Sequence, residues 1–100
     1  MPDPAHPKIA RPDHEILDVI RDRWSPRAFD ADRDVADADL RTLFEAARWA
    51  PSSRNEQPWR FVVARRRQSP DAFAAMLATL TRKNQAWAAV VPVVLGVSVR

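Results

Sequence analysis

The sequence has 100 residues, a hydrophobic fraction of 46%, a net charge of +3 and no cysteine. This length allows one domain at most, and the hydrophobic fraction excludes wholesale disorder. The lack of cysteine excludes disulfides, thiolate metal sites and a cysteine nucleophile. No apolar run reaches the roughly 20 residues that span a bilayer, and the N-terminal stretch has no hydrophobic segment typical of a secretory signal. We therefore expect a soluble cytoplasmic protein that does not enter a membrane.

Arginine supplies nearly all of the positive charge, because Lys8 and Lys83 are the two lysines. A guanidinium group binds carboxylate or phosphate through two parallel hydrogen bonds, whereas lysine acts as a point charge. The arginines are interleaved with aspartates, which disfavours nucleic-acid binding but leaves it as an alternative. The densest basic run, residues 65–67, follows an apolar stretch and is interpreted as a solvated strand end.

The first third of the chain is poor in regular structure. Residues 1–12 carry four prolines without apolar periodicity and are expected to form a flexible arm. Residues 13–100 are assigned to a single domain. A first helix is predicted from Asp13, as its N-cap, to about Arg23. Residues 25–34 are predicted to be a loop, because they are rich in aspartate and interrupted by proline.

A second helix is predicted over residues 37–49, since apolar side chains recur at the spacing of one buried stripe: Leu40, Leu43, Phe44 and Ala47. Pro51 ends this helix, because the residue before a proline is pushed out of helical geometry. Residues 51–58 then form a polar loop. Residues 59–64 are β-rich and predict a short strand that ends in charge.

Ser69-Pro70-Asp71 predicts the start of a third helix, capped by the serine and carrying a buried stripe: Phe73, Met76, Leu77 and Leu80. A short helix around residues 85–90 leads into residues 92–99, whose β-branched side chains are typical of a buried strand. The expected class is therefore α+β, with three or four helices packed on a small sheet of two strands. These elements do not close a layered core alone, so either a partner chain completes the structure or the sequence is a piece of a longer protein.

Residues 23–29 (RWSPRAF) are the first stretch whose side chains could bind a ligand. Arg23 and Arg27 flank Ser25, and together they can offer two guanidinium forks and a hydroxyl to an anion such as phosphate. The structural alternative is that arginines near a helix C-terminus interact favourably with the helix dipole. Taken alone, this stretch favours the structural interpretation.

Residues 47–61 (ARWAPSSRNEQPWRF) are the second such stretch. They place small hydroxyls and amides in a loop between two prolines, which can present neutral donors and acceptors to a flat heteroaromatic ring. A turn whose serine and asparagine side chains cap local backbone groups explains the same composition. Composition does not separate these two interpretations.

Taken together, the two stretches resemble the nitroreductase family. Its members carry an R-x-S-x-R-x-F-like stretch after the first helix and an A-P-S-S-x-N-x-Q-P-W-x-F stretch after the second. The resemblance extends from Glu15 to Val99 and includes residues 84–87 (NQAW) before the last strand. It implies a nitroreductase-like fold and a homodimer with FMN at the subunit interface. It also implies electron transfer from NAD(P)H through the flavin to a nitroaromatic, a quinone or a similar small acceptor.

The resemblance also assigns residues to the cofactor. The FMN phosphate and ribityl chain would be held by Arg23, Trp24 through its backbone, Ser25 and Arg27. The flavin ring would be approached from the other subunit by Pro51, Ser52, Ser53 and Asn55. Asn84 would hydrogen-bond the ring or the ribityl chain of its own subunit's FMN, while Gln57 and Trp59 would shape the loop. No catalytic side chain is expected, because the flavin carries the chemistry. No metal is expected either, because cysteine is absent and the two histidines have no matching carboxylate pattern.

Members of the family are longer than this chain, so the resemblance implies that residues 13–100 are the N-terminal half of a nitroreductase-like domain. The first hypothesis is thus a fragment of an FMN-dependent oxidoreductase. The second is a catalytically inactive remnant that binds flavin or dimerises. The third, from a different class of protein, is a small basic nucleic-acid-binding protein.

Overall fold

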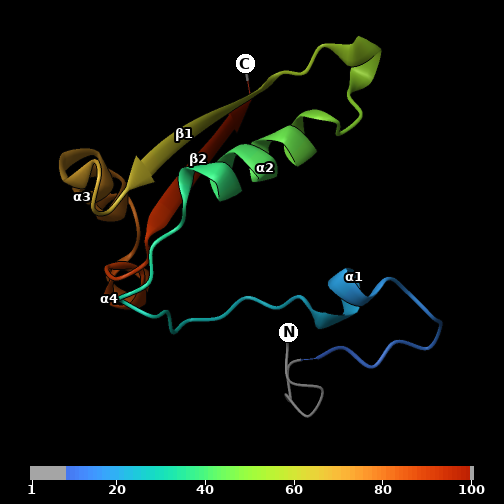
Figure 1. The fold of residues 1–100 in the computed structure, drawn as a ribbon, viewed down its shortest axis with the longest axis horizontal. Helices are drawn as coiled ribbons and strands as arrows, with labels where there is room; N and C mark the ends of the chain where they lie inside the picture. Colours follow the sequence, from blue (N-terminus) through green and yellow to red (C-terminus); the bar gives the residue numbers. More distant parts are fainter. Residues whose placement is uncertain (1–8, 100) are drawn as a thin grey trace.

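The computed structural model describes residues 9–99. Figure 1 shows the elements, which in chain order are α1 (Asp18–Asp22), α2 (Asp37–Arg48), the 3-10 helix η1 (Ser53–Asn55), β1 (Trp59–Arg65), α3 (Pro70–Ala78), α4 (Arg82–Ala88) and β2 (Val93–Val99). The expected α+β class is confirmed, and so is the expected order of helices and strands. Most of the predicted N-terminal arm, residues 1–8, lies outside the described residues.

The two strands form an antiparallel sheet in continuous register, from Trp59 opposite Val99 to Arg65 opposite Val93. The chain between them carries α3 and α4, which lie together at one end of the sheet (Figure 1). At that end the ladder continues by one bond, because the Arg66 N–H donates to the Pro92 carbonyl over 2.9 Å. The helical connection and the two strands therefore form one unit.

A small hydrophobic cluster lies where α3 and α4 meet the sheet. It consists of Ala64, Phe73 and Val91, with Met76, Leu77, Trp87 and Val94 packed against it. The predicted stripe of α3 is confirmed, because Phe73 is buried and its apolar neighbours on the helix are half-buried. This cluster anchors α4 and the residues that α4 carries.

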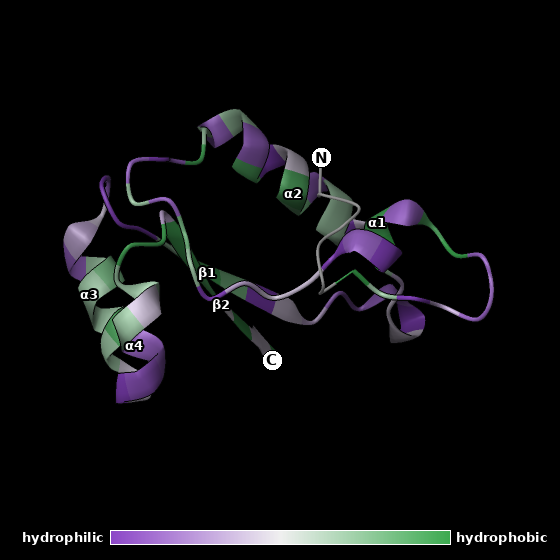
Figure 2. Cartoon of the chain, turned by 90° about the horizontal axis from the view of Figure 1, so that it is seen from below, coloured by the Kyte–Doolittle hydropathy of each residue, from purple (hydrophilic) through white to green (hydrophobic). Residues whose placement is uncertain are grey.

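Helix α2 lies along the sheet with an amphipathic surface, visible as alternating hydrophilic and hydrophobic bands in Figure 2. Leu40 is buried and the Phe44 ring packs against Phe61, with ring centroids 5.2 Å apart. The predicted burial of Leu43 is wrong, because its side chain is 57% exposed. The contact with the sheet is narrow, so only part of the predicted stripe faces it.

The expectation that residues 92–99 form a buried strand is also wrong. On β2, Leu95, Val97 and Val99 are exposed, and on β1 Val62 is 57% exposed. Helix α3 contacts both strands, but within residues 9–99 no second layer covers the part of the sheet farthest from α3 and α4. The radius of gyration is accordingly 16.1 Å, against about 13 Å for a compact domain of this length. The end of β2 at Val97 and Val99 is therefore open to solvent.

Helix α1 is shorter than predicted, because it starts at Asp18 with Leu17 as its N-cap instead of Asp13. Its apolar side chains, among them Val19 and Ile20, are exposed. Short helices are marginal in water and draw most of their stability from tertiary packing. Because the apolar side chains of this segment are exposed, the helix does not extend back to Asp13. The Ala10 N–H donates to the Arg21 carbonyl over 3.2 Å, which ties the preceding residues to this helix.

Two other helix starts differ in detail from the prediction. Helix α4 begins at Arg82 instead of near residue 85, because the Thr81 hydroxyl accepts the backbone N–H of Asn84. Ser69 precedes α3 as predicted, but its hydroxyl does not cap the helix. It accepts the N–H of Arg65 over 2.9 Å and donates to the Arg65 carbonyl over 3.1 Å. Ser69 therefore closes the turn between β1 and α3.

Candidate functional site

The first candidate stretch, residues 23–29, leaves α1 as irregular chain. Arg23 is the C-cap of α1 and already has extended backbone angles. Its Nη1 atom donates to the Ser25 hydroxyl over 3.4 Å, a long and weak hydrogen bond. The side chains of Arg23, Ser25 and Arg27 are all exposed. The three predicted donors thus lie along one short, accessible segment.

The arginines in this region differ in their ionic partners. Arg21 pairs with Asp18 over 3.1 Å and with Asp22 over 2.8 Å. The hydrogen bond from Arg21 also holds the pKa of Asp22 below its ordinary value, despite some desolvation. Within residues 9–99, neither Arg23 nor Arg27 forms an ion pair with a carboxylate. Their guanidinium groups therefore remain available to an external anion.

The end of this stretch is attached to α4 by an aromatic contact. The rings of Phe29 and Trp87 are stacked, with centroids 5.7 Å apart and planes at 18°. The Trp87 indole Nε1 in turn donates to Asn84 Oδ1 over 3.1 Å. The structure thus brings Asn84 together with the Phe29 end of the first stretch, although they are far apart in sequence.

The second candidate stretch forms a loop fixed to the end of α2. The Ser52 hydroxyl accepts the backbone N–H of Gln57 over 3.0 Å, and Gln57 Nε2 donates to the Arg48 carbonyl over 3.4 Å. Arg54, Asn55 and Gln57 have φ angles of 54°, 55° and 48°, in the left-handed region that side chains rarely adopt. The loop is held in this shape by its own hydrogen bonds. Its other residues that are predicted to contact the flavin ring are exposed: Pro51, Ser53 and Asn55.

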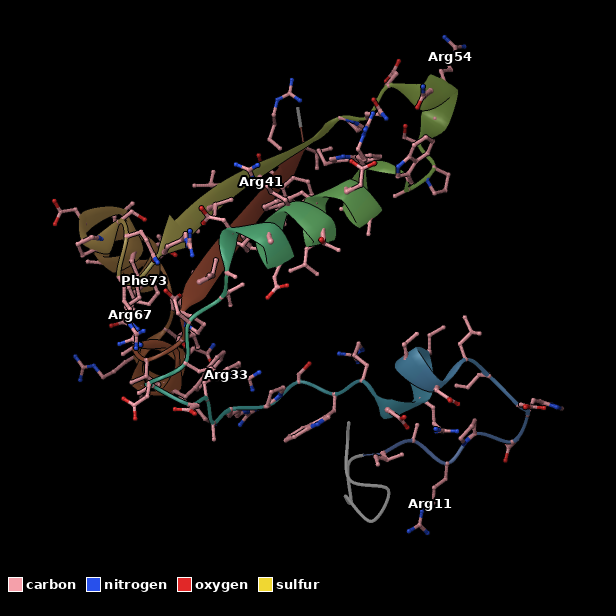
Figure 3. All side chains as sticks on the ribbon, in the orientation of Figure 1. Arg11, Arg33, Arg41, Arg54, Arg67 and Phe73 are labelled. Carbon is pink, nitrogen blue, oxygen red and sulfur yellow. The ribbon has the colours of Figure 1, made fainter. Side chains whose placement is uncertain are left out.

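The two stretches stand apart within one chain. In Figure 1, η1 lies at the end of β1 opposite to α3, whereas α1 and the residues that follow it run along another side of the molecule. Figure 3 shows Arg54 at the outer tip of the η1 loop, far from Arg33 in the segment that follows the first stretch. A single chain therefore does not bring Ser52, Ser53 and Asn55 to the arginines of the first stretch.

The interpretation of residues 65–67 as a solvated strand end is wrong. The Arg65 side chain is 17% exposed, pairs with Asp37 and donates from Nη2 to the Val35 carbonyl over 2.5 Å. Arg66 and Arg67 both donate to the Ala31 carbonyl. These contacts hold the segment that joins the first stretch to α2. The missed signal is complementary charge, since the basic run faces an aspartate-rich loop.

Asp34 belongs to the same connection. Its carboxylate accepts Gln68 Nε2 over 2.7 Å, and it also accepts the backbone N–H of Val35. The hydrogen bond from Gln68 is the main reason that the pKa of Asp34 lies below its ordinary value, and the positive charges of Arg65 and Arg67 add to the effect. Asp34 is therefore ionised at neutral pH and helps to attach the loop.

A cavity of about 360 Å³ lies next to the first stretch, with a lining made up of Ala28, Phe29, Asp30, Arg33, Asp34, Val35, Asp39 and Pro92. Three of these side chains are aspartates and one is an arginine, so the lining repels a phosphate. An anion is better accommodated by Arg23 and Arg27 on the exposed segment. Within residues 9–99, no helix is long and apolar enough to cross a membrane, and no three acidic or histidine side chains are grouped to hold a metal ion.

Comparison with known proteins places these features in a family. The profile of the nitroreductase family matches residues 20–96 of the chain. A solved structure described as an oxidoreductase containing FMN superposes with a TM-score of 0.81 and 35% sequence identity, over 93% of this chain and 46% of that one. The chain therefore belongs to the nitroreductase family.

Curated relatives support the same family at the level of sequence. The major NAD(P)H-flavin oxidoreductase of Aliivibrio fischeri is 36% identical over 67 residues, which cover 63% of this chain and 31% of that protein. A protein of Archaeoglobus fulgidus, named as an NADH dehydrogenase/NAD(P)H nitroreductase, is 44% identical over 54 residues, covering 54% of this chain and 30% of its own length. The chain thus spans about a third of the length of these relatives.

Proposed function

We propose that this chain is part of an FMN-dependent oxidoreductase that takes electrons from NAD(P)H and passes them to a nitroaromatic, a quinone or a similar small acceptor. The observation that carries the proposal is the exposed group formed by Arg23, Ser25 and Arg27, whose guanidinium groups form no ion pair within residues 9–99. The relatives named for flavin or nitroreductase activity, and the FMN-containing structural neighbour, support it.

The donor chemistry of the first stretch fits a phosphate. Two guanidinium forks and one hydroxyl can share the three oxygens of a terminal phosphate through charge-assisted hydrogen bonds. Arg23 and Ser25 already touch, so little rearrangement is needed for both to reach the same anion. In this proposal the backbone of Trp24, which lies between them, contributes as well.

The remaining proposed ligands concern the flavin ring. Asn84 belongs to the same chain as the residues proposed to bind the phosphate. The Phe29–Trp87 stack links Asn84 to the end of that stretch. The η1 loop, which carries Pro51, Ser52, Ser53 and Asn55, lies away from them and is proposed to reach the FMN of the partner subunit in a homodimer. Bound FMN supplies reversible hydride transfer, while the protein orients the ring and sets the electrostatics around it.

The proposal includes a cytoplasmic location, where NAD(P)H is available. Its test is an FMN titration of the protein purified after expression from the full-length gene, followed by flavin absorbance and by sedimentation to determine the oligomeric state. We expect a yellow dimer that oxidises NAD(P)H when given a quinone or a nitroaromatic. A colourless protein that binds no added FMN contradicts the proposal. Tight, salt-dependent binding to duplex DNA would instead favour a nucleic-acid-binding protein.

A further inference from the structure

Trp87 makes three contacts that involve different parts of its side chain. It packs against the buried cluster of Ala64, Phe73 and Val91, and its ring stacks on Phe29. Its indole Nε1 donates to Asn84 Oδ1 over 3.1 Å. The packing and the stack fix the plane of the indole, and therefore also the direction of its N–H.

The chemistry of the indole decides how the Asn84 amide is turned. An indole N–H can only donate, so the amide atom that faces it has to be the oxygen. The Asn84 nitrogen, with its two hydrogens, then points away from Trp87. Since the Asn84 side chain is exposed, these hydrogens are accessible to a ligand.

The backbone of Asn84 is held as well. The Thr81 hydroxyl accepts its N–H at the start of α4, and the other end of that helix is fixed by the buried Ala88. Both partners of the Trp87–Asn84 hydrogen bond are thus attached to the folded part of the chain. An exposed amide without such a partner would rotate freely and present either its oxygen or its nitrogen.

We infer that Trp87 is a positioning residue that fixes Asn84 as a hydrogen-bond donor to an acceptor atom of the flavin ring, a ring carbonyl or a ring nitrogen. The inference rests on the proposed function, because it takes FMN as the ligand. It goes further by assigning the direction of the hydrogen bond and the residue that sets it. The Asn84 amide nitrogen therefore pairs with a ring acceptor and not with the ring N–H of the flavin, since two donors do not bond to each other.

The alternative is that Trp87 acts only by packing against Phe29. Trp87→Phe separates the two roles, because phenylalanine keeps an aromatic ring for the stack but lacks the N–H. Trp49→Phe is the matched control: it removes an indole N–H that donates to Glu45 over 2.9 Å, from an exposed tryptophan at the end of α2 that is not among the residues assigned to FMN. Asn84→Ala removes the amide altogether.

Two measurements test the inference. The first is the NMR signal of the Trp87 indole N–H in the protein without FMN, which we expect to shift upfield in Asn84→Ala as its acceptor is lost. The second is a double-mutant cycle on FMN affinity, followed by flavin absorbance. We expect Trp87→Phe to weaken FMN binding about fivefold in the wild-type background. In the Asn84→Ala background it should have no further effect, and Trp49→Phe should have none in either.

The outcomes separate the inference from the function on which it rests. Losses in Trp87→Phe and Asn84→Ala that simply add overturn the positioning role of Trp87 while FMN binding itself stands. An indole signal that does not respond to Asn84→Ala overturns it as well. If no variant and not even the wild type binds FMN, both the proposed function and the assignment of flavin as the partner of Asn84 fail.

Discussion

The rings of Phe44 and Phe61 pack against each other at a tilt of 56°, with their centroids 5.2 Å apart, and join α2 to β1. Tilted aromatic pairs are favourable because the positive edge of one ring meets the negative face of the other. Around this pair the two elements leave a groove of about 430 Å³, which is lined by residues that include Phe44, Phe61 and Val63. The aromatic pair is therefore one of the contacts that attach α2 to β1, beside the Arg65–Asp37 ion pair.

Phe44→Ala should destabilise the protein by about 2 kcal/mol, because it removes a half-buried ring and its aromatic partner contact. Leu43→Ala, next to it on α2, is the matched control, since the Leu43 side chain is 57% exposed. Urea unfolding followed by tryptophan fluorescence measures both free energies of unfolding. Equal losses in the two variants would mean that α2 is not attached through Phe44.

Arg27→Ala should weaken FMN binding by about tenfold, the effect of losing one charge-assisted hydrogen bond to a phosphate. Arg41→Ala is a suitable control for this experiment, and Arg66→Ala is not. Arg41 is exposed on α2, whereas Arg66 donates to the Ala31 carbonyl and is needed by the loop. Fluorescence titration of FMN gives both affinities. If the two variants bind FMN equally, Arg27 does not contact the phosphate.

Arg65→Ala should lower the free energy of unfolding by about 2 kcal/mol, because the Val35 carbonyl and Asp37 lose their partner at once. Arg60→Ala, at an exposed position on the same strand, serves as the control, since within residues 9–99 Arg60 donates only to the carbonyl of its neighbour Trp59. Urea unfolding at neutral pH compares the variants. A loss no larger than that of the control would show that the loop is held by other contacts.

The hydrogen bond between Asp34 and Gln68, which attaches the segment before α2 to the turn after β1, should be sensitive to acid. Its pKa is lower in the folded state than in the unfolded chain, chiefly because Gln68 donates to the carboxylate. The unfolded state therefore binds more protons, so the contribution of Asp34 is present above its unfolded pKa. We expect that contribution to be lost as the pH falls below about 4, towards the folded pKa.

The pKa of Asp34 can be followed directly by NMR titration of its side-chain carboxyl carbon. Gln68→Ala should raise this pKa towards the ordinary value, since it removes the largest cause of the shift. Asp22, whose pKa is lowered by Arg21 instead, should be unaffected and provides an internal control. An unchanged Asp34 titration in Gln68→Ala would refute this assignment.

Elements with a local cause could be predicted from the sequence. Helix α2 and strand β1 match their predictions to within a residue, since apolar periodicity and Pro51 mark them. The start of α4 also has a local cause, the Thr81 hydroxyl at its N-cap, which apolar periodicity does not reveal. The length of α1 and the exposure of Val97 depend on tertiary packing with distant segments, which the neighbouring sequence does not reveal.

The candidate site divides in the same way. Arg23, Ser25 and Arg27 are neighbours in sequence, so their motif alone identifies them. The contacts of Trp87 with Phe29 and of Arg65 with Asp37 join distant segments. Pairings of this kind arise from the path of the backbone and from complementary charge across it. Sequence spacing within one stretch carries no record of them.

The register of the sheet has a consequence for the order in which the chain folds. Arg65 and Val93 are the pair closest in sequence, and Trp59 and Val99 the most distant. Closing a longer loop costs more conformational entropy, so pairing should begin beside α3 and α4 and proceed outwards. Local helices form faster than strands with distant partners. The two helices between the strands therefore act as a folding nucleus, and the exposed end of the sheet, next to η1, is the last to form and the first to fray.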